Sequence, residues 1–168
     1  MPLDVPDGTP CFVDSNIFYY ALVPTPPLSD PCINLLNRAL SARLSLSVSI
    51  SVLSDTLHKV MTSEVAQLAK RDRAGIIGYL GKHPEIIGKL VEYPLAIDRL
   101  KTLPLTILPV DDQLLRDAVS IAVTHHLLTN DALIIALMQR HQLTHLITND
   151  DDFDRVPGLT IWKPRQPS

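Results

Sequence analysis

The sequence predicts an α/β protein, a three-layer α/β/α domain built around a central, mainly parallel sheet of about five strands. Short apolar runs alternate with segments of helical periodicity along the whole chain, which is the pattern of parallel strands joined by covering helices. Hydrophobic residues make up 46% of the sequence and aromatic residues only 5%, which indicates an aliphatic core. The 168 residues have the length of one domain, so we expect residues 1–168 to form a single domain rather than two.

Five short apolar segments are expected to form the strands. Each is bounded by turn residues or by a change to helical periodicity. The first segment ends at Asp14, and the second alternates apolar residues with serine, as a strand does. The expected strands lie at residues 11–13, 44–50, 105–110, 145–148 and 159–162.

Proline and capping residues delimit the expected helices. The proline-rich residues 24–27 stop a first helix near Leu22. Ser29 or Asp30 then caps a second helix that reaches about Leu40. Further helices are expected from residue 51, at 111–124 and at 131–142, and residues 64–102 are expected to form two or three helices that elaborate the domain.

The ends of the chain and its composition argue against several classes of protein. Residues 1–9 are expected to be a flexible N-terminal arm and residues 164–168 a C-terminal tail. No apolar run approaches the roughly 20 residues that span a membrane, and the N-terminus lacks the basic region and apolar stretch of a signal peptide. Charged residues make up 20%, which argues against a disordered chain. We expect a cytoplasmic protein without a membrane segment.

Charge and cysteine usage restrict the partners. A net charge of −3 gives no general attraction to nucleic acid, so RNA would need a local basic patch or cations that offset an acidic site. Cys11 and Cys32 form neither a disulfide framework nor a zinc-ligand pattern. We expect Cys11 to be a small buried hydrophobic residue. The six histidines show no metal-ligand spacing.

Two aspartates follow directly after expected strands. Asp14 ends the first strand, and Asp150 follows the strand at residues 145–148. Because ligands bind at the carboxyl ends of strands in open parallel sheets, both are candidate site residues. For Asp14, an N-cap of the following helix is an equally good explanation. Asp150 begins an acidic run for which a solvated loop is the other explanation, and Asp152 is the second candidate within it.

Two further candidates lie on expected helices. Asp131 opens a helix whose next seven residues, 132–138, are all apolar. A helix that is apolar all round is buried, so the Asp131 carboxylate either lies in a cleft or only caps the helix. Asp55 lies on the polar face opposite Leu53 and Leu57, where a solvated surface is the commoner explanation. It becomes a candidate only if that face turns toward Asp14.

Four carboxylates at one edge of the sheet would form a site of hard oxygen ligands. Such ligands suit Mg²⁺ or Mn²⁺ and disfavour zinc and copper. Magnesium keeps several waters and shares its coordination shell with substrate phosphates. The pattern therefore indicates hydrolysis of a phosphodiester bond.

The order of these motifs resembles the PIN-domain family, particularly the VapC-type toxins of toxin–antitoxin pairs. The resemblance extends over nearly the whole chain, and its most specific part is a closing Thr-x-Asp-x-Asp-Phe signature that begins at Thr148. One position departs from the family pattern, because the second acid is usually Glu and here it is Asp55. The four similar segments are residues 12–17, 51–60, 130–136 and 146–153.

The resemblance implies a metal-dependent endoribonuclease that leaves 5′-phosphate and 3′-hydroxyl ends. One or two Mg²⁺ or Mn²⁺ ions would be held by Asp14, Asp55, Asp131 and Asp150. The residues that would orient carboxylates or waters around the metal are Asn16, Thr148 and Asp152.

The resemblance also implies partners: single-stranded or looped RNA as substrate, a small antitoxin protein that blocks the cleft, and a second copy of the chain in a homodimer. Lys59, Lys70, Arg71 and Arg73 are candidate contacts to the RNA backbone, with a mixed charged surface as the other explanation. Two alternatives stay open. One is a binding module with little activity, because Asp55 replaces Glu, and the other is a nuclease of RNA processing.

Overall fold

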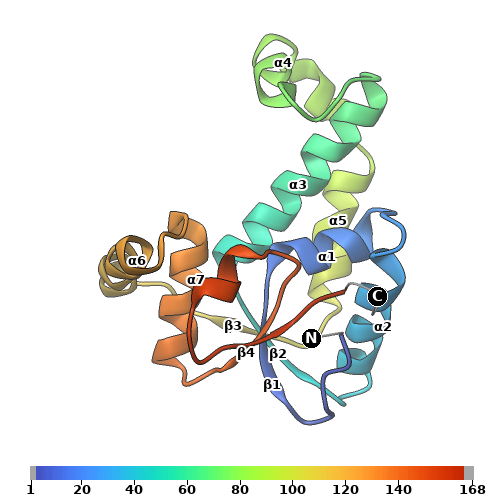
Figure 1. The fold of residues 1–168 in the computed structure, drawn as a ribbon. Helices are drawn as coiled ribbons and strands as arrows, with labels where there is room; N and C mark the ends of the chain where they lie inside the picture. The colour runs from blue at the N-terminus through green and yellow to red at the C-terminus, as the bar shows by residue number, and fades with distance from the viewer. Residues whose placement is uncertain (1–2, 165–168) are drawn as a thin grey trace.

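The computed structural model describes residues 3–164, which are built around one parallel sheet (Figure 1). Its five strands lie in the order β3-β2-β1-β4-β5, and every neighbouring pair is parallel. Helices flank this sheet, so the predicted α/β/α class is confirmed. The strands are β1 (Pro10–Val13), β2 (Ser45–Ser49), β3 (Leu105–Leu108), β4 (His145–Ile147) and β5 (Thr160–Trp162).

The connections between strands place the helices in two layers. From β1 the chain moves outward through β2 to β3, and it then returns across the sheet to β4 on the other side of β1. Because crossovers between parallel strands are right-handed, the helices of the return path lie on the opposite face from the helices of the outward path. Figure 1 shows α6 and α7 on one side of the strands, with α2 and α5 on the other. The order of the strands reverses beside β1, and such a reversal opens a crevice at the carboxyl ends of β1 and β4.

The helices follow the predicted pattern with shifts of a few residues at their ends. Asp111, the first residue of the helix expected at 111–124, caps α6, and its Oδ1 accepts a hydrogen bond from the Leu114 amide at 2.8 Å. The helix expected to open at Asp131 begins two residues earlier, which places Asp131 inside its first turn. The helices are α1 (Ser15–Leu22), α2 (Ser29–Leu40), α3 (Ile50–Leu68), α4 (Ile76–Lys82), η1 (Pro84–Lys89), α5 (Glu92–Lys101), α6 (Asp112–His125), α7 (Thr129–Arg140) and η2 (Asp152–Arg155).

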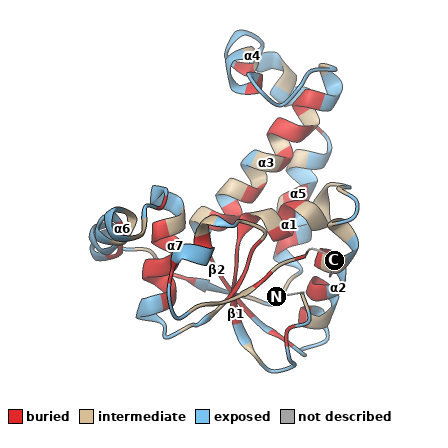
Figure 2. Ribbon diagram, viewed as in Figure 1, coloured by how far each residue is buried: buried red, intermediate tan, exposed pale blue. Residues whose placement is uncertain are grey.

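The core is aliphatic and runs along the central strands and α7 (Figure 2). Phe12 and Leu146, on the neighbouring strands β1 and β4, are completely buried. All seven residues of α7 from position 132 to 138 are also buried, as the apolar run predicted. Cys11 and Cys32 belong to the same core, and burial raises the pKa of each thiol to about 12. The site therefore stands on a closely packed base.

The predicted helical elaboration projects from the sheet as a helical arm, which we define as residues 64–101 (Figure 1). It has its own small core of Val65, Ala66, Ile76, Leu80 and Leu90. The α5 helix, which returns to the body, has no capping side chain at its own first residue.

A carboxylate of α3 takes the place of that cap. The amides of Val91, Glu92 and Tyr93 donate to the Glu64 carboxylate at 2.7, 3.1 and 2.8 Å. These bonds join the beginning of α5 to the far half of α3. The two helices that carry the helical arm are thereby fixed to each other.

The N-terminal segment lies against the body in the part that the structure describes, residues 3–9, where we expected a flexible arm. Val5 is completely buried, and Asp7 forms ion pairs with Arg38 and Arg43 at 2.6 and 2.8 Å. Of the expected C-terminal tail, residues 165–168 lie outside the described part of the chain. Within residues 3–164, no single helix is long and apolar enough to cross a membrane; α6 and α7 would reach that length and composition only together, and they are bent by 112°.

Candidate metal centre

The four predicted carboxylates line one cleft at the carboxyl ends of β1 and β4. The cleft has a volume of about 390 Å³, and we call it the carboxylate cleft. Strand β1 delivers Asp14, and the loop after β4 delivers Asp150. Asp55 comes from the first turns of α3, and Asp131 comes from the first turn of α7. The fold therefore brings together residues that are far apart in the sequence.

Asp14 is a buried carboxylate, only 8% exposed, that receives four hydrogen bonds. Its Oδ1 accepts from the Ser15 amide at 2.5 Å and the Ser15 hydroxyl at 3.1 Å. Its Oδ2 accepts from Asn16 Nδ2 at 2.6 Å and Thr148 Oγ1 at 2.8 Å. Burial nevertheless raises the pKa of Asp14 above its usual value. Asp14 is both the N-cap of α1 and a wall of the cleft, so the two explanations of its position hold together.

Asn16 and Thr148 link the first helix to the loop after β4. Asn16 Nδ2 also donates to Thr148 Oγ1 at 3.0 Å, and Asn16 Oδ1 accepts from the Asn149 amide at 3.1 Å. The amide of Asp150 donates to Thr148 Oγ1 at 3.0 Å. The two residues therefore contact Asp14 directly and fix the backbone that carries Asp150.

Three carboxylates form the group best arranged to bind a cation. One oxygen each of Asp131, Asp150 and Asp152 lies within 4.8 Å of the others. Burial and the charges of Asp14, Asp150 and Asp152 raise the pKa of Asp131 to about 6. Among the described residues, no side chain or amide donates a hydrogen bond to the Asp131 carboxylate. A set of repelling oxygen donors, of which Asp131 has no hydrogen-bond donor of its own, fits a hard divalent cation.

The four aspartates of the acidic run after β4 have two kinds of surroundings. Asp151 and Asp154 form ion pairs with Lys163 at 2.6 and 2.7 Å, which is the behaviour of a solvated loop. Asp150, by contrast, lines the carboxylate cleft, and its Oδ1 accepts from the Asp152 amide at 2.8 Å. Asp152 joins the cation-binding group while it also pairs with Arg155.

Asp55 lies in the cleft but outside the group of three. Its Oδ2 accepts from the Ser15 hydroxyl at 2.5 Å and pairs with Lys59 Nζ at 2.7 Å. Burial acts to raise the pKa of Asp55, but the bonds from Lys59 and Ser15 outweigh it and hold that pKa below its usual value. Ser15 Oγ thus connects Asp55 to Asp14.

Two further residues contribute to the cleft beside the predicted carboxylates. Ser15 was not among the predicted site residues, and its hydroxyl contacts two carboxylates. Lys59, a candidate contact to the RNA backbone, lies in the carboxylate cleft and donates to Ser15 Oγ at 2.6 Å. A signal for Lys59 was present, because residues four apart on a helix face each other and it follows Asp55 by four.

Comparison with known proteins identifies the family. Residues 11–159 match the family model of the PIN domain, which covers most of the chain. This chain belongs to the PIN domain family. Its sequence is similar to Ribonuclease VapC6 of Methanocaldococcus jannaschii, with 26% identity over 153 residues, 90% of this chain and 95% of the relative.

Solved structures of VapC proteins show a similar fold at low sequence identity. Mycobacterium tuberculosis VapC20, described as a Sarcin-Ricin loop cleaving toxin, has a TM-score of 0.59 at 17% identity and covers 88% of this chain and 95% of its own. VapBC2 from Rickettsia felis, solved with a DNA fragment from its promoter, has a TM-score of 0.56 at 17% identity, with 92% and 98% covered. The resemblance to the PIN-domain family that the motifs indicated is confirmed.

The remaining basic candidates of this PIN domain lie beyond the carboxylate cleft. Lys70, Arg71 and Arg73 line a separate cleft of about 770 Å³ where α3 ends and α4 begins. The carboxylate cleft offers three chemical features. They are the group of Asp131, Asp150 and Asp152, which we call the cation seat, the Asp14 carboxylate with its four hydrogen-bond donors, and the ammonium group of Lys59. Those elements suit a substrate that brings its own negative charge, as a phosphodiester does.

Proposed function

We propose that this PIN domain is a Mg²⁺- or Mn²⁺-dependent endoribonuclease and the toxin of a type II toxin–antitoxin pair. The observation that carries the proposal is the group of Asp131, Asp150 and Asp152, whose oxygens lie within 4.8 Å of one another beside Asp14. The name of the sequence relative, Ribonuclease VapC6, supports RNA as the substrate class.

The residues that would hold the ion are Asp131, Asp150 and Asp152, with Asp14 adjoining them. A bound divalent ion supplies charge that offsets the charge developing on the phosphate and that acidifies an attacking water. Asn16 and Thr148 each donate to Asp14 Oδ2 and so keep its carboxylate in one orientation. Preorganised groups of this kind lower the cost of reorganisation during the reaction.

Lys59 contributes a positive charge that the substrate can share. Its ammonium group balances Asp55 and Ser15 in this structure. A phosphate entering the carboxylate cleft brings negative charge toward that ammonium group, which attracts it. Asp55, one methylene shorter than Glu, then serves to position Lys59 and Ser15 as well as to add negative charge near the ion.

The test is cleavage of a panel of single-stranded RNAs by the purified protein, with Mn²⁺ present or chelated. We expect cleavage only with the metal, and we expect Asp14→Asn to reduce the rate by at least about 100-fold, equivalent to about 2.7 kcal/mol of transition-state stabilisation. Asp98→Asn, an exposed carboxylate of α5, is the matched control and should cleave like the parent. Cleavage that survives chelation, or an Asp14→Asn variant as fast as the parent, contradicts the nuclease proposal.

One observation favours a second candidate, a binding module with little activity. Asp55 is already neutralised by Lys59 and lies outside the group of three carboxylates. Such a module would bind RNA and metal without cleaving. Binding without metal-dependent cleavage across the whole RNA panel would favour it over the nuclease.

The partner proposals rest on relatives. The Rickettsia felis structure is named as a VapBC pair, and a structure from Klebsiella pneumoniae with a TM-score of 0.50 at 20% identity is named as a toxin–antitoxin complex. We propose a small antitoxin for this chain too, a homodimer, and the cytoplasm as the location in which RNA is met. Co-expression with the product of a short upstream reading frame should yield a complex that no longer cleaves RNA. A chain that stays uncomplexed and cleaves RNA unchanged would contradict the antitoxin proposal.

A further inference from the structure

The carboxylate cleft continues into two further clefts toward the helical arm. A second cleft of about 550 Å³ shares Asn16, Lys59 and Asp150 with it, and adds Tyr19, Tyr20 and Arg73; we call it the tyrosine cleft. The third cleft, of about 770 Å³, shares Arg73 with the tyrosine cleft; we call it the basic cleft. The three clefts therefore form one surface that leads from the carboxylates to the base of α4.

The charge along this surface changes sign with distance from the carboxylates. The tyrosine cleft holds Lys59 and Arg73, opposed by Asp150 and Asp151 at its edge. The basic cleft holds Lys70, Arg71 and Arg73, opposed by Asp72. A polyanion placed with one phosphate at the cation seat thus meets increasing positive charge toward the helical arm.

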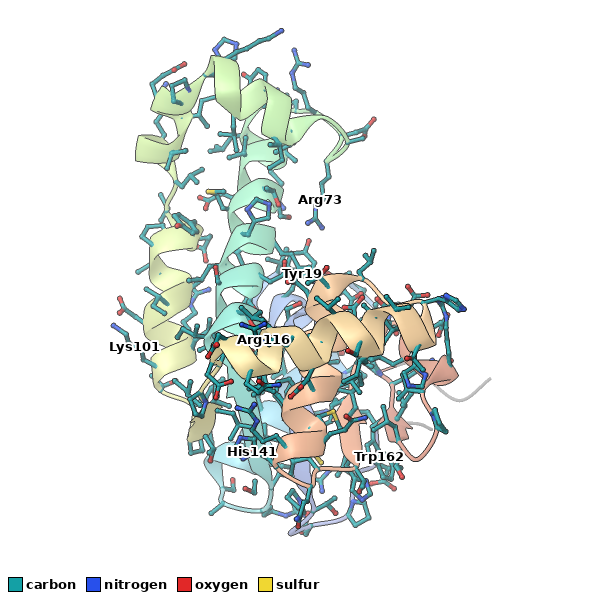
Figure 3. All side chains as sticks on the ribbon, turned by 90° about the vertical axis from the view of Figure 1, so that its left-hand side faces the viewer. Tyr19, Arg73, Lys101, Arg116, His141 and Trp162 are labelled. Carbon is teal, nitrogen blue, oxygen red and sulfur yellow. The ribbon has the colours of Figure 1, made fainter. Side chains whose placement is uncertain are left out.

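Arg73 spans the gap between the helical arm and the body. Its Nη1 donates to the Tyr19 hydroxyl at 3.1 Å, and its guanidinium carbon lies 5.0 Å from the centre of the Tyr19 ring. Figure 3 shows the side chain reaching from the segment before α4 down toward Tyr19. Because the ring and the hydroxyl hold the guanidinium in place, little side-chain entropy is lost when the planar group also meets a phosphate.

The tyrosine cleft also offers aromatic surface. Tyr20 lines it, and the Tyr20 hydroxyl accepts from Asn149 Nδ2 at 3.3 Å, directly beside Asp150. The rings of Tyr19 and Tyr20 meet edge to face at 5.7 Å. Two of the four tyrosines of the chain thus lie between the cation seat and Arg73. Unpaired bases stack on aromatic side chains without sequence preference, which a paired duplex does not allow.

We propose that single-stranded RNA leaves the carboxylate cleft past Lys59, crosses Tyr20, and binds with its backbone on Arg73 and then on Lys70 and Arg71. This inference rests on the proposed function and names the path of its substrate. The strand runs toward the helical arm, and the faces of α5 and α6 that carry Lys101 and Arg116 lie outside the path (Figure 3). The path gives the helical arm a function, as the part of the domain that holds the substrate.

The first test is the affinity of chelator-treated protein for a labelled single-stranded RNA, measured by fluorescence anisotropy at several salt concentrations. We expect Arg73→Met to weaken binding by about 5- to 10-fold and to lower the slope of log Kd against log salt by about 0.7, as for one lost phosphate contact. Lys70→Met, at an exposed position, should act in the same direction and guards against a fold defect in Arg73→Met.

The controls are Lys101→Met and Arg116→Met, which remove the same charge outside the path (Figure 3). Both should bind RNA like the parent. The path is overturned if Arg73→Met and Lys70→Met bind like the parent, or if Arg116→Met weakens binding as much. A polyglutamate peptide provides one more test. The path is overturned if the peptide binds as tightly as RNA and if Arg73→Met weakens the binding of both equally, because the clefts would then select an acidic protein.

Cleavage and binding separate this inference from the proposed function. If the protein binds RNA along these residues but cleaves none, the path stands and the nuclease proposal fails. If it cleaves RNA and the Arg73 and Lys70 variants bind normally, the nuclease stands and the path fails. Crosslinking of 4-thiouridine RNA provides a direct map: adducts within residues 16–25 or 63–76 support the path, and adducts confined to α6 contradict it.

Discussion

At the residue scale, the carboxylates of the cleft have different electrostatic surroundings. Asp14 receives four hydrogen bonds, and Asp55 is paired with an ammonium group. Asp131 receives neither and faces the charges of its neighbours. Because a half-buried charge without a partner is costly, the charge of Asp131 opposes folding in the absence of metal. A cation removes that opposition, so stability and metal binding are coupled at this position.

Asp131→Asn should stabilise the metal-free protein at neutral pH. The pKa of Asp131 in the folded state is about 6, above the ordinary 3.8, so the folded state holds the proton more tightly. The charged Asp131 carboxylate therefore destabilises the folded state fully above about pH 6, and this destabilisation is lost as the pH falls toward 3.8. For a half-buried carboxyl screened by water we expect a gain of about 1 kcal/mol, or roughly 2–4 °C in Tm, at pH 7–8.

Thermal unfolding of chelator-treated protein at several pH values measures this effect. The difference in Tm between Asp131→Asn and the parent should shrink steadily below pH 6 and vanish near pH 4. Asp98→Asn, on the exposed face of α5, should shift Tm by little at any pH. A variant less stable than the parent at pH 8 would mean that Asp131 makes a favourable contact in the metal-free protein.

The residues of the site could be predicted from sequence where local structure fixes them. Asp14 and Asp150 each follow a strand, and the ends of parallel strands meet at one edge whatever the details of packing. Asp55 could not be placed in this way, because its position depends on how α3 crosses α1. The contacts of Ser15 depend on the same crossing and on its side-chain rotamer, which no periodicity records. The spacing of four residues indicates the pairing of Lys59 with Asp55, but not its contact with Ser15.

At the scale of elements, α3 joins the two parts of the molecule. Its first turns carry Asp55 and Lys59 into the carboxylate cleft, and its far half forms one side of the helical arm. Glu64 lies between these regions and accepts from three amides at the start of α5. These bonds fix α3 to the start of α5, and the segment between the two helices carries Arg73.

Glu64→Ala should loosen the helical arm. The change leaves the Val91, Glu92 and Tyr93 amides without their acceptor, and α5 has no capping side chain of its own. We expect a loss of about 1–3 kcal/mol, as for hydrogen bonds to a charged group at a helix start. Amide hydrogen exchange at residues 91–95 should become at least about 10-fold faster.

Gln67→Ala is the matched control, because Gln67 is the exposed residue on the following part of the same helix. It should leave both stability and exchange of α5 within about 0.5 kcal/mol of the parent. Equal protection of residues 91–95 in the Glu64→Ala variant and the parent would show that packing of α5 against α3 alone determines its start.

Element prediction succeeded where burial determines periodicity. The apolar run of α7 and most residues of the central strands β1, β2 and β4 are buried, and the ends of these elements shifted by only a few residues. The helical arm was less certain, because its helices are short and its core is small. Glycine and proline in residues 75–94 interrupt the pattern without showing which helices pack together.

At the scale of the whole molecule, the acidic balance of the chain and an RNA substrate are compatible because the charges are separated in space. Four of the acidic side chains line the carboxylate cleft, where a divalent cation can offset their charge. Lys70, Arg71 and Arg73 gather on the helical arm at the other end of the proposed path. Net charge alone therefore could not decide the partner, because attraction depends on local arrangement.

Metal binding should stabilise the entire domain. The cation seat is built from α7 and from the loop after β4, and Asp14 from the end of β1 adjoins it, so an unfolded chain cannot present the same oxygens together. Mn²⁺ at about 100 times its Kd should add about 2.7 kcal/mol, or roughly 5–10 °C in Tm. Protons compete with Mn²⁺ for Asp131, whose pKa is about 6, so the shift in Tm should be larger at pH 7.5 than at pH 5.5.

In Asp131→Asn the Mn²⁺ shift in Tm should largely disappear, although that variant is the more stable one without metal. Asp98→Asn should keep the full shift. An equal Mn²⁺ shift in Asp131→Asn and the parent would place the ion elsewhere in the domain, because a seat that uses the Asp131 carboxylate loses a charged ligand when a neutral amide replaces it.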